Sequence, residues 1–255
     1  SESEKFAWAD TTYTFEPMMS NWRALQICTS HVLWEWFMKQ FDVSFQDRNG
    51  GVSYPSYTSW GMSTRSIWGI ISSHSDDKWL VIPPKLSEFK AIILPIYWKE
   101  NEQKVNWYVE KIAEILTNTT VKSPYKWEYF KKYSWDNEVL VDFRNVRLWE
   151  KITDFELSGY PVRIECWERD IENNNCVVAS RITWEKVIIS LDDLSTTVER
   201  MLEEWQKYLF DKSAERLKNN IVACYSLADI WNAVEAWKFA IYEWDKNPEF
   251  EKEIK

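Results

Sequence analysis

The sequence predicts an α/β (α+β) protein of two units, and three observations carry this prediction. Residues 91–96 (AIILPI) form a short, continuous apolar run, as expected for a parallel strand that is buried on both faces. Strand-like and helical patterns alternate after that run, which indicates βαβ connections. Paired prolines at 83–84 interrupt regular structure and separate this unit from an earlier, strand-rich one. At 255 residues the chain is long enough for each unit to bury a core.

The first unit is expected to contain short strands around one helix. Leu33, Phe37 and Phe41 recur at helical spacing, and Ser30 can cap a helix that begins near His31 and ends near residue 41. The other expected elements are a buried strand at 23–28, strands at 41–45 and 54–59, a turn at 49–51 and an amphipathic helix at 63–73.

The second unit begins near Phe89 and continues past the first buried strand. Gly159 is expected to close a short helix, since glycine is favoured just past a helix end. The expected elements are helices at 102–116, 151–157 and 191–219, strands at 139–142, 162–166 and 176–181, and a polar, helical tail at 221–255.

Net charge, apolar runs and cysteine spacing argue against a non-specific nucleic-acid coat, a membrane-spanning protein and a zinc protein. The net charge is −9, which argues against a non-specific nucleic-acid coat but not against an RNA bound through a local basic patch. No apolar run reaches the roughly 18 residues of a membrane span. The four cysteines are scattered without a CxxC pair, which fits a reduced cytoplasmic protein and gives no zinc signature.

The glycine and tryptophan contents are abnormal. The chain has 18 Trp and 5 Gly, whereas an average usage of about 7% would give roughly 18 Gly. Trp184 lies between two strand-like runs, where a hairpin turn needs a positive φ that glycine tolerates and tryptophan does not. We hypothesise that most of these tryptophans are glycines in the native protein, encoded by UGA. The alternative is an unusually aromatic protein that uses tryptophan in its core or as a stacking surface.

This hypothesis is applied to some of the tryptophans only. Trp60 and Trp244 are taken as genuine. The positions expected to be glycine are Trp8, Trp22, Trp34, Trp36, Trp68, Trp79, Trp98, Trp149, Trp167, Trp184, Trp231 and Trp237.

Three motifs occur in order along the chain. Residues 58–65 (TSWGMSTR) are followed by 76–85 (DDKWLVIPPK), and together they resemble motif 3 of the archaeal/eukaryotic-type prolyl-tRNA synthetases, with Trp79 in place of a glycine. Residues 23–34 (RALQICTSHVLW) resemble the strand and helix before it, and residues 155–165 (FELSGYPVRIE) extend the resemblance into the second unit. The resemblance therefore covers nearly the whole chain.

The resemblance implies a domain organisation. Residues 1–88 would be the C-terminal part of a class II synthetase catalytic core, which is an antiparallel sheet. Residues 89–195 would be a mixed-sheet α/β anticodon-binding domain, and residues 196–255 a connecting helix with a partial C-terminal domain.

The resemblance also implies a site that binds proline and ATP with Mg²⁺. Activation of an amino acid places negative charge on the α-phosphate, which a fixed guanidinium can stabilise. The motif 3 arginine, Arg65, would take this catalytic role; by itself it would be interpreted as a surface ion pair. The full set implied for ATP and proline is Gln26, Thr29, His31, Ser59, Trp60, Gly61 and Arg65.

Within this set the residue types suit different tasks. Gln26 and Thr29 would contact ATP and the aminoacyl end, whereas His31, Ser59 and Trp60 would help to form the proline pocket. A flat indole suits a pyrrolidine ring. The ordinary alternatives are a helix N-cap for the histidine and a core position for the tryptophan.

The second unit is expected to bind the anticodon of tRNA(Pro). Splayed anticodon bases are recognised through hydrogen bonds to their edges and through stacking. The polar residues that match the family are Asp142, Arg144, Glu156, Arg163, Glu165, Arg169 and Asp170, each with an ordinary alternative as a surface ion pair. The basic, aromatic stretch at 122–133 lies outside the resemblance, and we expect a solvated loop there rather than an insertion that meets the tRNA backbone.

Several family features are missing from the sequence. Motifs 1 and 2, which build the dimer interface and supply an ATP-binding arginine, are absent, so we expect a fragment that does not activate proline unaided. The full-length enzyme would be a cytoplasmic homodimer. The zinc cysteines of the family's C-terminal domain are absent and His74, Asp76 and Asp77 are interpreted as a solvated loop, so no metal site is predicted.

Two other functions remain open. A non-catalytic tRNA-binding or regulatory paralogue would keep the anticodon domain beside a degenerate core. An ordinary α/β metabolic enzyme is disfavoured because the sequence has neither a glycine-rich phosphate loop nor a catalytic triad.

Overall fold

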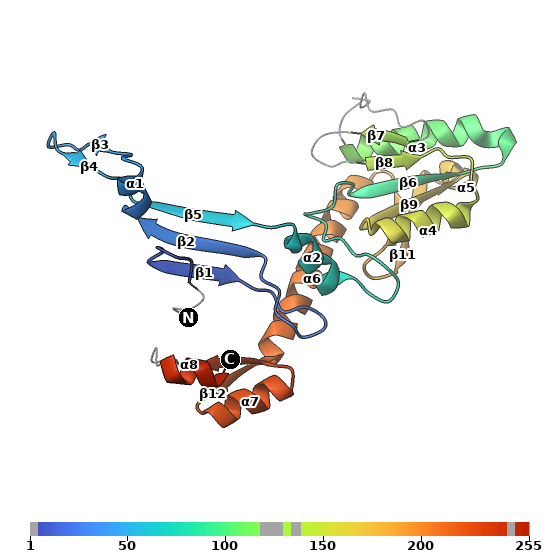
Figure 1. Ribbon diagram of the computed structural model, residues 1–255. Coiled ribbons are helices and arrows are strands. Elements are labelled where there is room, and N and C mark those ends of the chain that lie inside the picture. The colour runs from blue at the N-terminus through green and yellow to red at the C-terminus, as the bar shows by residue number, and fades with distance from the viewer. Residues whose placement is uncertain (1–4, 118–129, 134–138, 244–247, 255) are drawn as a thin grey trace. The chain divides into compact units, whose positions relative to one another are not determined.

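The computed structural model describes residues 5–117, 130–133, 139–243 and 248–254. It divides into two compact units, one of residues 1–73 with 215–255 and the other of residues 74–214 (Figure 1). Most of the basic stretch expected at 122–133, and Trp244, lie outside the described residues. Within the described part of the chain, every helix is too short or too polar to cross a membrane.

A six-stranded mixed sheet organises the unit of residues 74–214. Strand β6 pairs in parallel with β8 on one side and β9 on the other, and the remaining pairs are antiparallel. The order across the sheet is β11-β10-β9-β6-β8-β7. The strands are β6 (Ala91–Ile96), β7 (Phe130–Tyr133), β8 (Val139–Asp142), β9 (Val162–Trp167), β10 (Asn175–Ser180) and β11 (Lys186–Ser190).

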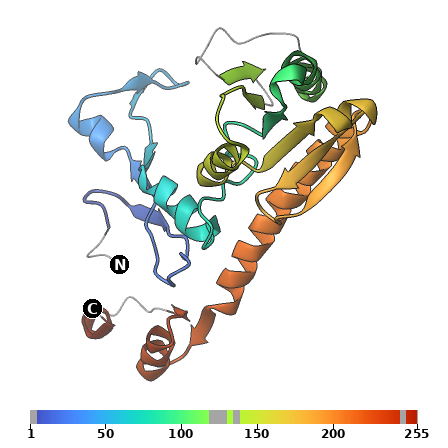
Figure 2. The same cartoon turned by 90° about the vertical axis from the view of Figure 1, so that its right-hand side faces the viewer.

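Helices cover both faces of this sheet, as can be followed in Figure 2. Ala91 and Ile93 of β6 belong to a buried cluster that includes residues of α3 (Glu102–Thr117) and the start of α6 (Leu194–Asn219). The alternate residues Ile92 and Leu94 belong to a second cluster that includes residues of α4 (Leu148–Ser158). Successive side chains of a strand point to opposite faces of the sheet. Because both faces are covered by helices here, every residue of β6 is apolar.

Several predictions for this unit are confirmed. The run at 91–96 is a buried strand with parallel neighbours, and the expected helices and strands between 102 and 219 all form, with ends shifted by a few residues. Gly159 follows α4 with a φ of 69°. A Cβ atom at this position would lie 2.7 Å from the carbonyl oxygen of Leu80, so the loop before β6 passes where only glycine leaves room.

The other unit contains a three-stranded antiparallel sheet of order β1-β2-β5. The helix expected from His31 to Phe41 is confirmed only in its second half, as α1. Its first half is wrong, because residues 28–34 form the central strand of this sheet and pair on both sides. The buried strand expected at 23–28 is also wrong, since only its last residue is in a strand. The elements are β1 (Thr11–Phe15), β2 (Cys28–Trp34), α1 (Trp36–Gln40), β3 (Phe45–Gln46), β4 (Val52–Ser53), β5 (Tyr57–Met62) and α2 (Arg65–His74).

The C-terminal residues form a βαβ arrangement rather than the expected helical tail. Strands β12 (Ile221–Cys224) and β13 (Phe239–Tyr242) pair in parallel and are connected by α7 (Leu227–Glu235). A last helix, α8, covers Pro248–Ile254. Ser226 caps α7 by accepting a hydrogen bond from the backbone N–H of Asp229 at 3.2 Å.

Candidate functional site

A cavity of about 620 Å³ lies where the parallel strands of the mixed sheet end. Strands β6, β8 and β9 run in the same direction, so the segments that follow them meet at one edge of the sheet. Open α/β sheets bind ligands at this edge. The lining residues come from these three segments: Ile96, Tyr97, Trp98, Arg147, Leu148, Trp167, Glu168 and Arg169.

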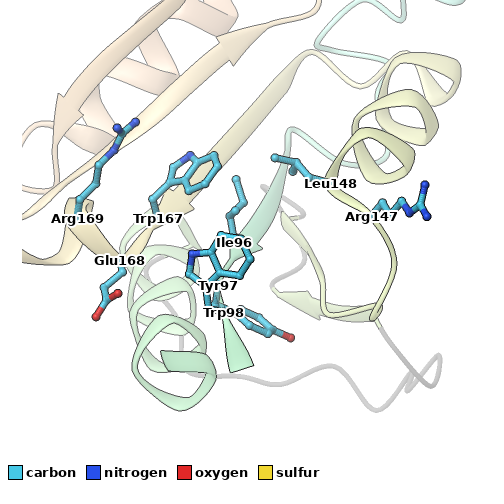
Figure 3. A pocket seen from close by; sticks show the side chains of 8 residues that line it. All are labelled: Ile96, Tyr97, Trp98, Arg147, Leu148, Trp167, Glu168 and Arg169. Atoms are coloured by element: carbon cyan, nitrogen blue, oxygen red, sulfur yellow. The ribbon is translucent and has the colours of Figure 1, made fainter. Parts of the chain in front are cut away.

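The lining combines aromatic rings with two cationic side chains. In Figure 3 the rings of Tyr97, Trp98 and Trp167 lie between Arg147 and Arg169. The Tyr97 hydroxyl lies 3.2 Å from a carboxylate oxygen of Glu102, and burial together with this carboxylate raises the pKa of the phenol. An apolar, aromatic floor with arginines at its sides suits a planar, anionic ligand such as a nucleotide.

Arg169 and Asp170 are neighbours with different tasks. The Arg169 side chain is 75% exposed and its guanidinium lies 5.6 Å from the centre of the Trp167 ring. Asp170 is buried, and its carboxylate accepts a hydrogen bond from the Trp167 backbone N–H at 2.8 Å at the start of α5 (Glu168–Glu172). The arginine is therefore available to a ligand, whereas the aspartate fixes the loop that carries it.

Arg163 and Glu165 form a buried ion pair on β9. The Arg163 Nε lies 3.0 Å from a carboxylate oxygen of Glu165, and Lys186 of β11 reaches the same oxygen at 2.9 Å. Glu156 of α4 approaches the Arg163 guanidinium at 3.6 Å. Both β9 side chains are only 7% exposed, so these groups neutralise one another inside the domain.

Asp142 and Arg144 form a second ion pair at the end of β8. Asp142 is fully buried and accepts hydrogen bonds from the Arg144 guanidinium at 2.8 to 3.2 Å, which raises the pKa of the arginine. Asp154 accepts another hydrogen bond from this guanidinium at 2.7 Å. The Lys151 ammonium donates to the Asp142 carbonyl oxygen at 2.9 Å, and burial lowers the pKa of Lys151.

The structure thus divides the seven polar residues predicted to contact the anticodon into three groups. The first group is the ion pair of Asp142 with Arg144, and the second is the ion-paired set of Glu156, Arg163 and Glu165. The third group is Arg169 and Asp170, whose Nε and carboxylate oxygen lie 3.7 Å apart, and of the seven residues only Arg169 lines the cavity. Sequence reasoning missed Tyr97 and Arg147 as lining residues. Their positions just after strand β6 and just before helix α4 were a usable signal, since residues that follow parallel strands converge at one edge.

A second cavity, of about 370 Å³, lies in the unit that contains β2 and β5. It brings together four of the residues predicted to bind ATP and proline, namely Gln26, Thr29, Gly61 and Arg65. Arg65 is exposed at the start of α2, where the positive end of the helix dipole also favours an anion. This arrangement could hold a phosphate group.

The other three predicted residues, His31, Ser59 and Trp60, do not line this cavity. His31 lies opposite Ser59 across β2 and β5, and its Nδ1 lies 2.9 Å from the hydroxyl oxygen of Thr12. Trp60 lies opposite Ser30. Because side chains alternate between the faces of a sheet, Trp60 points away from the face that carries His31 and Ser59.

The described residues contain no group of three or more His, Cys, Asp or Glu side chains arranged to hold a metal ion. The four cysteines are free thiols, and Cys166 and Cys176 are buried in the mixed-sheet unit. Burial raises the pKa of the Cys176 thiol to about 12 and that of Cys166 well above its ordinary value.

Comparison with known proteins identifies relatives of both units. Residues 90–201 match the family model described as "Anticodon binding domain". The chain is 38% identical over 258 residues to a protein of Parabacteroides distasonis and 40% identical over 256 residues to one of Chlorobaculum tepidum, both named "Proline--tRNA ligase". A protein of the same name from Mesomycoplasma hyopneumoniae is 36% identical over 253 residues.

These matches cover nearly all of this chain but only part of each relative. The Parabacteroides and Chlorobaculum alignments include 100% of this chain and 49% and 50% of the relatives, and the Mesomycoplasma alignment includes 99% and 49%. The chain therefore spans about half the length of the curated relatives that it matches.

Proposed function

We propose that this chain is the C-terminal portion of a prolyl-tRNA synthetase of the archaeal/eukaryotic type. The full-length enzyme would activate proline with ATP and transfer it to tRNA(Pro). The observation that carries the proposal is the similarity, along the whole chain, to proteins named proline--tRNA ligase. The motif 3 resemblance at residues 58–65 supports the archaeal/eukaryotic type.

The antiparallel sheet β1-β2-β5 is the proposed remnant of a class II catalytic core. We assign the 370 Å³ cavity to the phosphates of MgATP, with Arg65 as the cation that stabilises the α-phosphate. Gln26 and Thr29 would contact the nucleotide and the aminoacyl end from the same cavity. Gly61 would allow close approach of a ligand, since the space beside its Cα is open and an added Cβ would meet no atom within 4 Å.

The proposed proline pocket uses one face of this sheet. Thr29, His31, Ser59 and Gly61 share that face by register. We leave Trp60 out of the pocket because it lies on the opposite face, 75% exposed, where it could meet another part of the full-length enzyme.

The proposed anticodon site is the cavity at the edge of the mixed sheet. Exposed Arg169 could pair with a base edge or a phosphate, and Tyr97 could stack on a base. The buried pairs Asp142–Arg144 and Arg163–Glu165 would hold the sheet edge and contribute to RNA binding through its shape. The proposed domains are 1–88, 89–195 and 196–255, and the full-length enzyme would be a cytoplasmic homodimer.

Filter binding of a tRNA(Pro) transcript to the 255-residue chain tests the RNA-binding part of the proposal. Arg169→Ala should weaken binding by about 1–3 kcal/mol, the usual worth of a specific arginine contact. Arg200→Ala is the matched control, since Arg200 is also exposed and paired, with Glu204 at 2.8 Å, but lies on α6 and does not line the cavity. A transcript with a substituted anticodon should bind the unaltered chain more weakly, and equal binding of both transcripts would refute the proposed site.

The catalytic part needs the full-length protein. Proline-dependent exchange of pyrophosphate into ATP should be detectable there and should be lost on Arg65→Ala. A full-length protein that binds tRNA(Pro) without this exchange would refute the synthetase assignment.

A further inference from the structure

Six of the tryptophans that the structure describes have a backbone conformation that suits glycine. Only two other non-glycine residues in the described part of the chain share it, Asp42 and Asn174, and these residue types tolerate it best. No phenylalanine or tyrosine that the structure describes has a positive φ. The six are Trp8 (71°), Trp22 (64°), Trp34 (46°), Trp79 (93°), Trp184 (63°) and Trp237 (58°).

Trp237 occupies the position after a helix where glycine is most strongly preferred. Its N–H donates to the Val234 carbonyl at 2.9 Å, and the N–H of Lys238 donates to the Ala233 carbonyl at 2.8 Å. This pair of hydrogen bonds closes α7 as a Schellman motif, in which the residue at the position of Trp237 is left-handed and usually glycine.

Trp22 and Trp184 are the last residues of hairpin loops. The Met19 N–H donates a hydrogen bond to the Arg23 carbonyl at 3.0 Å, and Trp22 is the last of the three loop residues between them. Loops of this length favour a glycine in the left-handed conformation at their last position. Trp184 is likewise the last residue between Ser180 and Glu185, where the Ser180 N–H donates to the Glu185 carbonyl at 2.9 Å and the Trp184 N–H donates to the Ser180 carbonyl at 3.1 Å.

The remaining three positions are also places where the chain turns or the pairing shifts. Trp8 is the third residue of a turn that is closed by the Ala9 N–H and the Phe6 carbonyl at 3.1 Å, and a positive φ there requires glycine or asparagine. Trp34 lies where the pairing register of β2 and β5 shifts. Trp79 forms an antiparallel β-bridge with Asp76, and residues 77–78 form the turn between them. Bulges and turns are standard positions for glycine.

The indole rings at these positions contribute little burial. The six side chains are between 40% and 62% exposed, whereas Trp205 of α6 is 5% exposed and belongs to the core of the mixed-sheet unit. Two of the rings make specific contacts: Trp8 stacks on Trp36 with ring centres 4.4 Å apart, and the Arg181 guanidinium lies 4.5 Å from the centre of the Trp184 ring. All six side chains nevertheless stay exposed to solvent, so the backbone conformation is the feature that they share.

We infer that these six positions carry glycine in the protein as its own cell makes it. The codon read here as tryptophan would be UGA, decoded by a glycine tRNA whose anticodon pairs with UGA. Trp205 and Trp60 would be encoded by UGG, because the first is a core residue and the second lies in a regular strand.

The width of the proposed anticodon cavity depends on whether two of its lining tryptophans are also glycine in the native protein. Trp98 and Trp167 line it without a positive φ, so their backbone gives no argument for or against glycine. If they share the codon of the six, the native cavity is wider by two indole rings.

Two readouts on the native material test the inference. In the gene, all six positions should be UGA and those of Trp205 and Trp60 should be UGG. In peptides of the protein isolated from the cells that encode it, each of the six positions should be lighter by the difference between an indolylmethyl group and a hydrogen atom, while the Trp205 peptide keeps its indole. UGG codons or indole-containing peptides at the six positions would overturn the inference, and neither readout depends on tRNA binding.

A pair of variants of the 255-residue chain tests the conformational argument separately. Trp237→Gly should move the urea midpoint of the unit that contains α7 upward, because the left-handed position is relieved. Trp231→Gly is the matched control. Trp231 is also expected from the sequence to be glycine and is comparably exposed, but it lies inside α7 without a positive φ, so this substitution should move the midpoint downward. A lower midpoint for Trp237→Gly would show that the position is built around the indole and would count against the inference.

Discussion

The buried guanidinium of Arg181 gives the sharpest stability prediction. Its side chain is fully buried, and it donates two hydrogen bonds to Asp76 at 2.9 and 3.0 Å and a third to the Lys78 carbonyl at 2.8 Å. Asp76 lies in the loop that was expected to be merely solvated. Instead, this carboxylate supplies the only anionic partner that the described residues offer to Arg181.

Asp76→Ala should destabilise the mixed-sheet unit strongly. Removing one member of a buried ion pair costs about 3–5 kcal/mol, because the remaining charge stays desolvated. The Asp76 side chain is 38% exposed, so water can partly replace it, and we expect the lower end, about 3 kcal/mol. Arg181→Met keeps most of the volume and removes the charge, so its expected cost is about 1 kcal/mol.

Urea unfolding followed by circular dichroism measures both costs. A loss below about 1 kcal/mol for Asp76→Ala, or an equal loss for Arg181→Met, would refute the argument that the stranded charge dominates. The hydrogen bonds from Arg181 also hold the pKa of Asp76 below its ordinary value. A depressed pKa stabilises the fold above the unfolded pKa, so the difference between the unaltered chain and Asp76→Asn should be constant from about pH 7 to pH 5 and shrink below about pH 4.

Three further perturbations have defined outcomes. Gly159→Ala should cost at least about 2 kcal/mol in urea unfolding, because a Cβ would lie 2.7 Å from a backbone oxygen at a φ of 69°; a neutral effect would contradict this packing. Cys176 should react with a thiol reagent at pH 8 only as fast as the protein unfolds, since burial raises its pKa to about 12, whereas partly exposed Cys28 should react first. Arg144→Ala should cost about 3 kcal/mol by leaving Asp142 buried without its partner, and thermal unfolding with a lowered midpoint would verify it.

The sequence patterns predicted the mixed-sheet unit best, because burial on two faces leaves a clear signal. Residues 91–96 are apolar without alternation, and this alone indicated a central parallel strand. The helix 102–116 was equally clear from its periodicity. In both cases local preference and tertiary environment agree.

The β2 strand was mispredicted because two patterns overlap there. Leu33, Phe37 and Phe41 follow a helical period, but hydrogen bonds to β1 and β5 on both sides hold residues 28–34 extended. Those partners lie about twenty residues before and thirty after, beyond any local window. The four-residue strands β12 and β13 were missed for a related reason, since each is too short to show a period and each depends on the other.

The sequence predicted the residues of the 370 Å³ cavity better than those of the 620 Å³ cavity. Motif order brought Gln26, Thr29, Gly61 and Arg65 into one set, and the structure brings them into one cavity. The order of the motifs could not reveal that Arg163 and Glu165 are buried. Lys186, which pairs with Glu165, lies on β11, two strands away from β9 in the sheet. Charged residues in a sequence indicate polarity, whereas their exposure depends on which strands become neighbours.

The cavity at the edge of the mixed sheet has a consequence for how recognition can evolve. Its walls are the last residues of β6 and β9 and the segments that follow β6, β8 and β9, whereas the rest of these strands supplies the core. Substitutions in those short segments can change the ligand without disturbing the packing beneath them. If the cavity binds the anticodon as proposed, one scaffold can acquire a different nucleotide preference through a few replacements, and grafting these three segments between related domains would redesign its specificity.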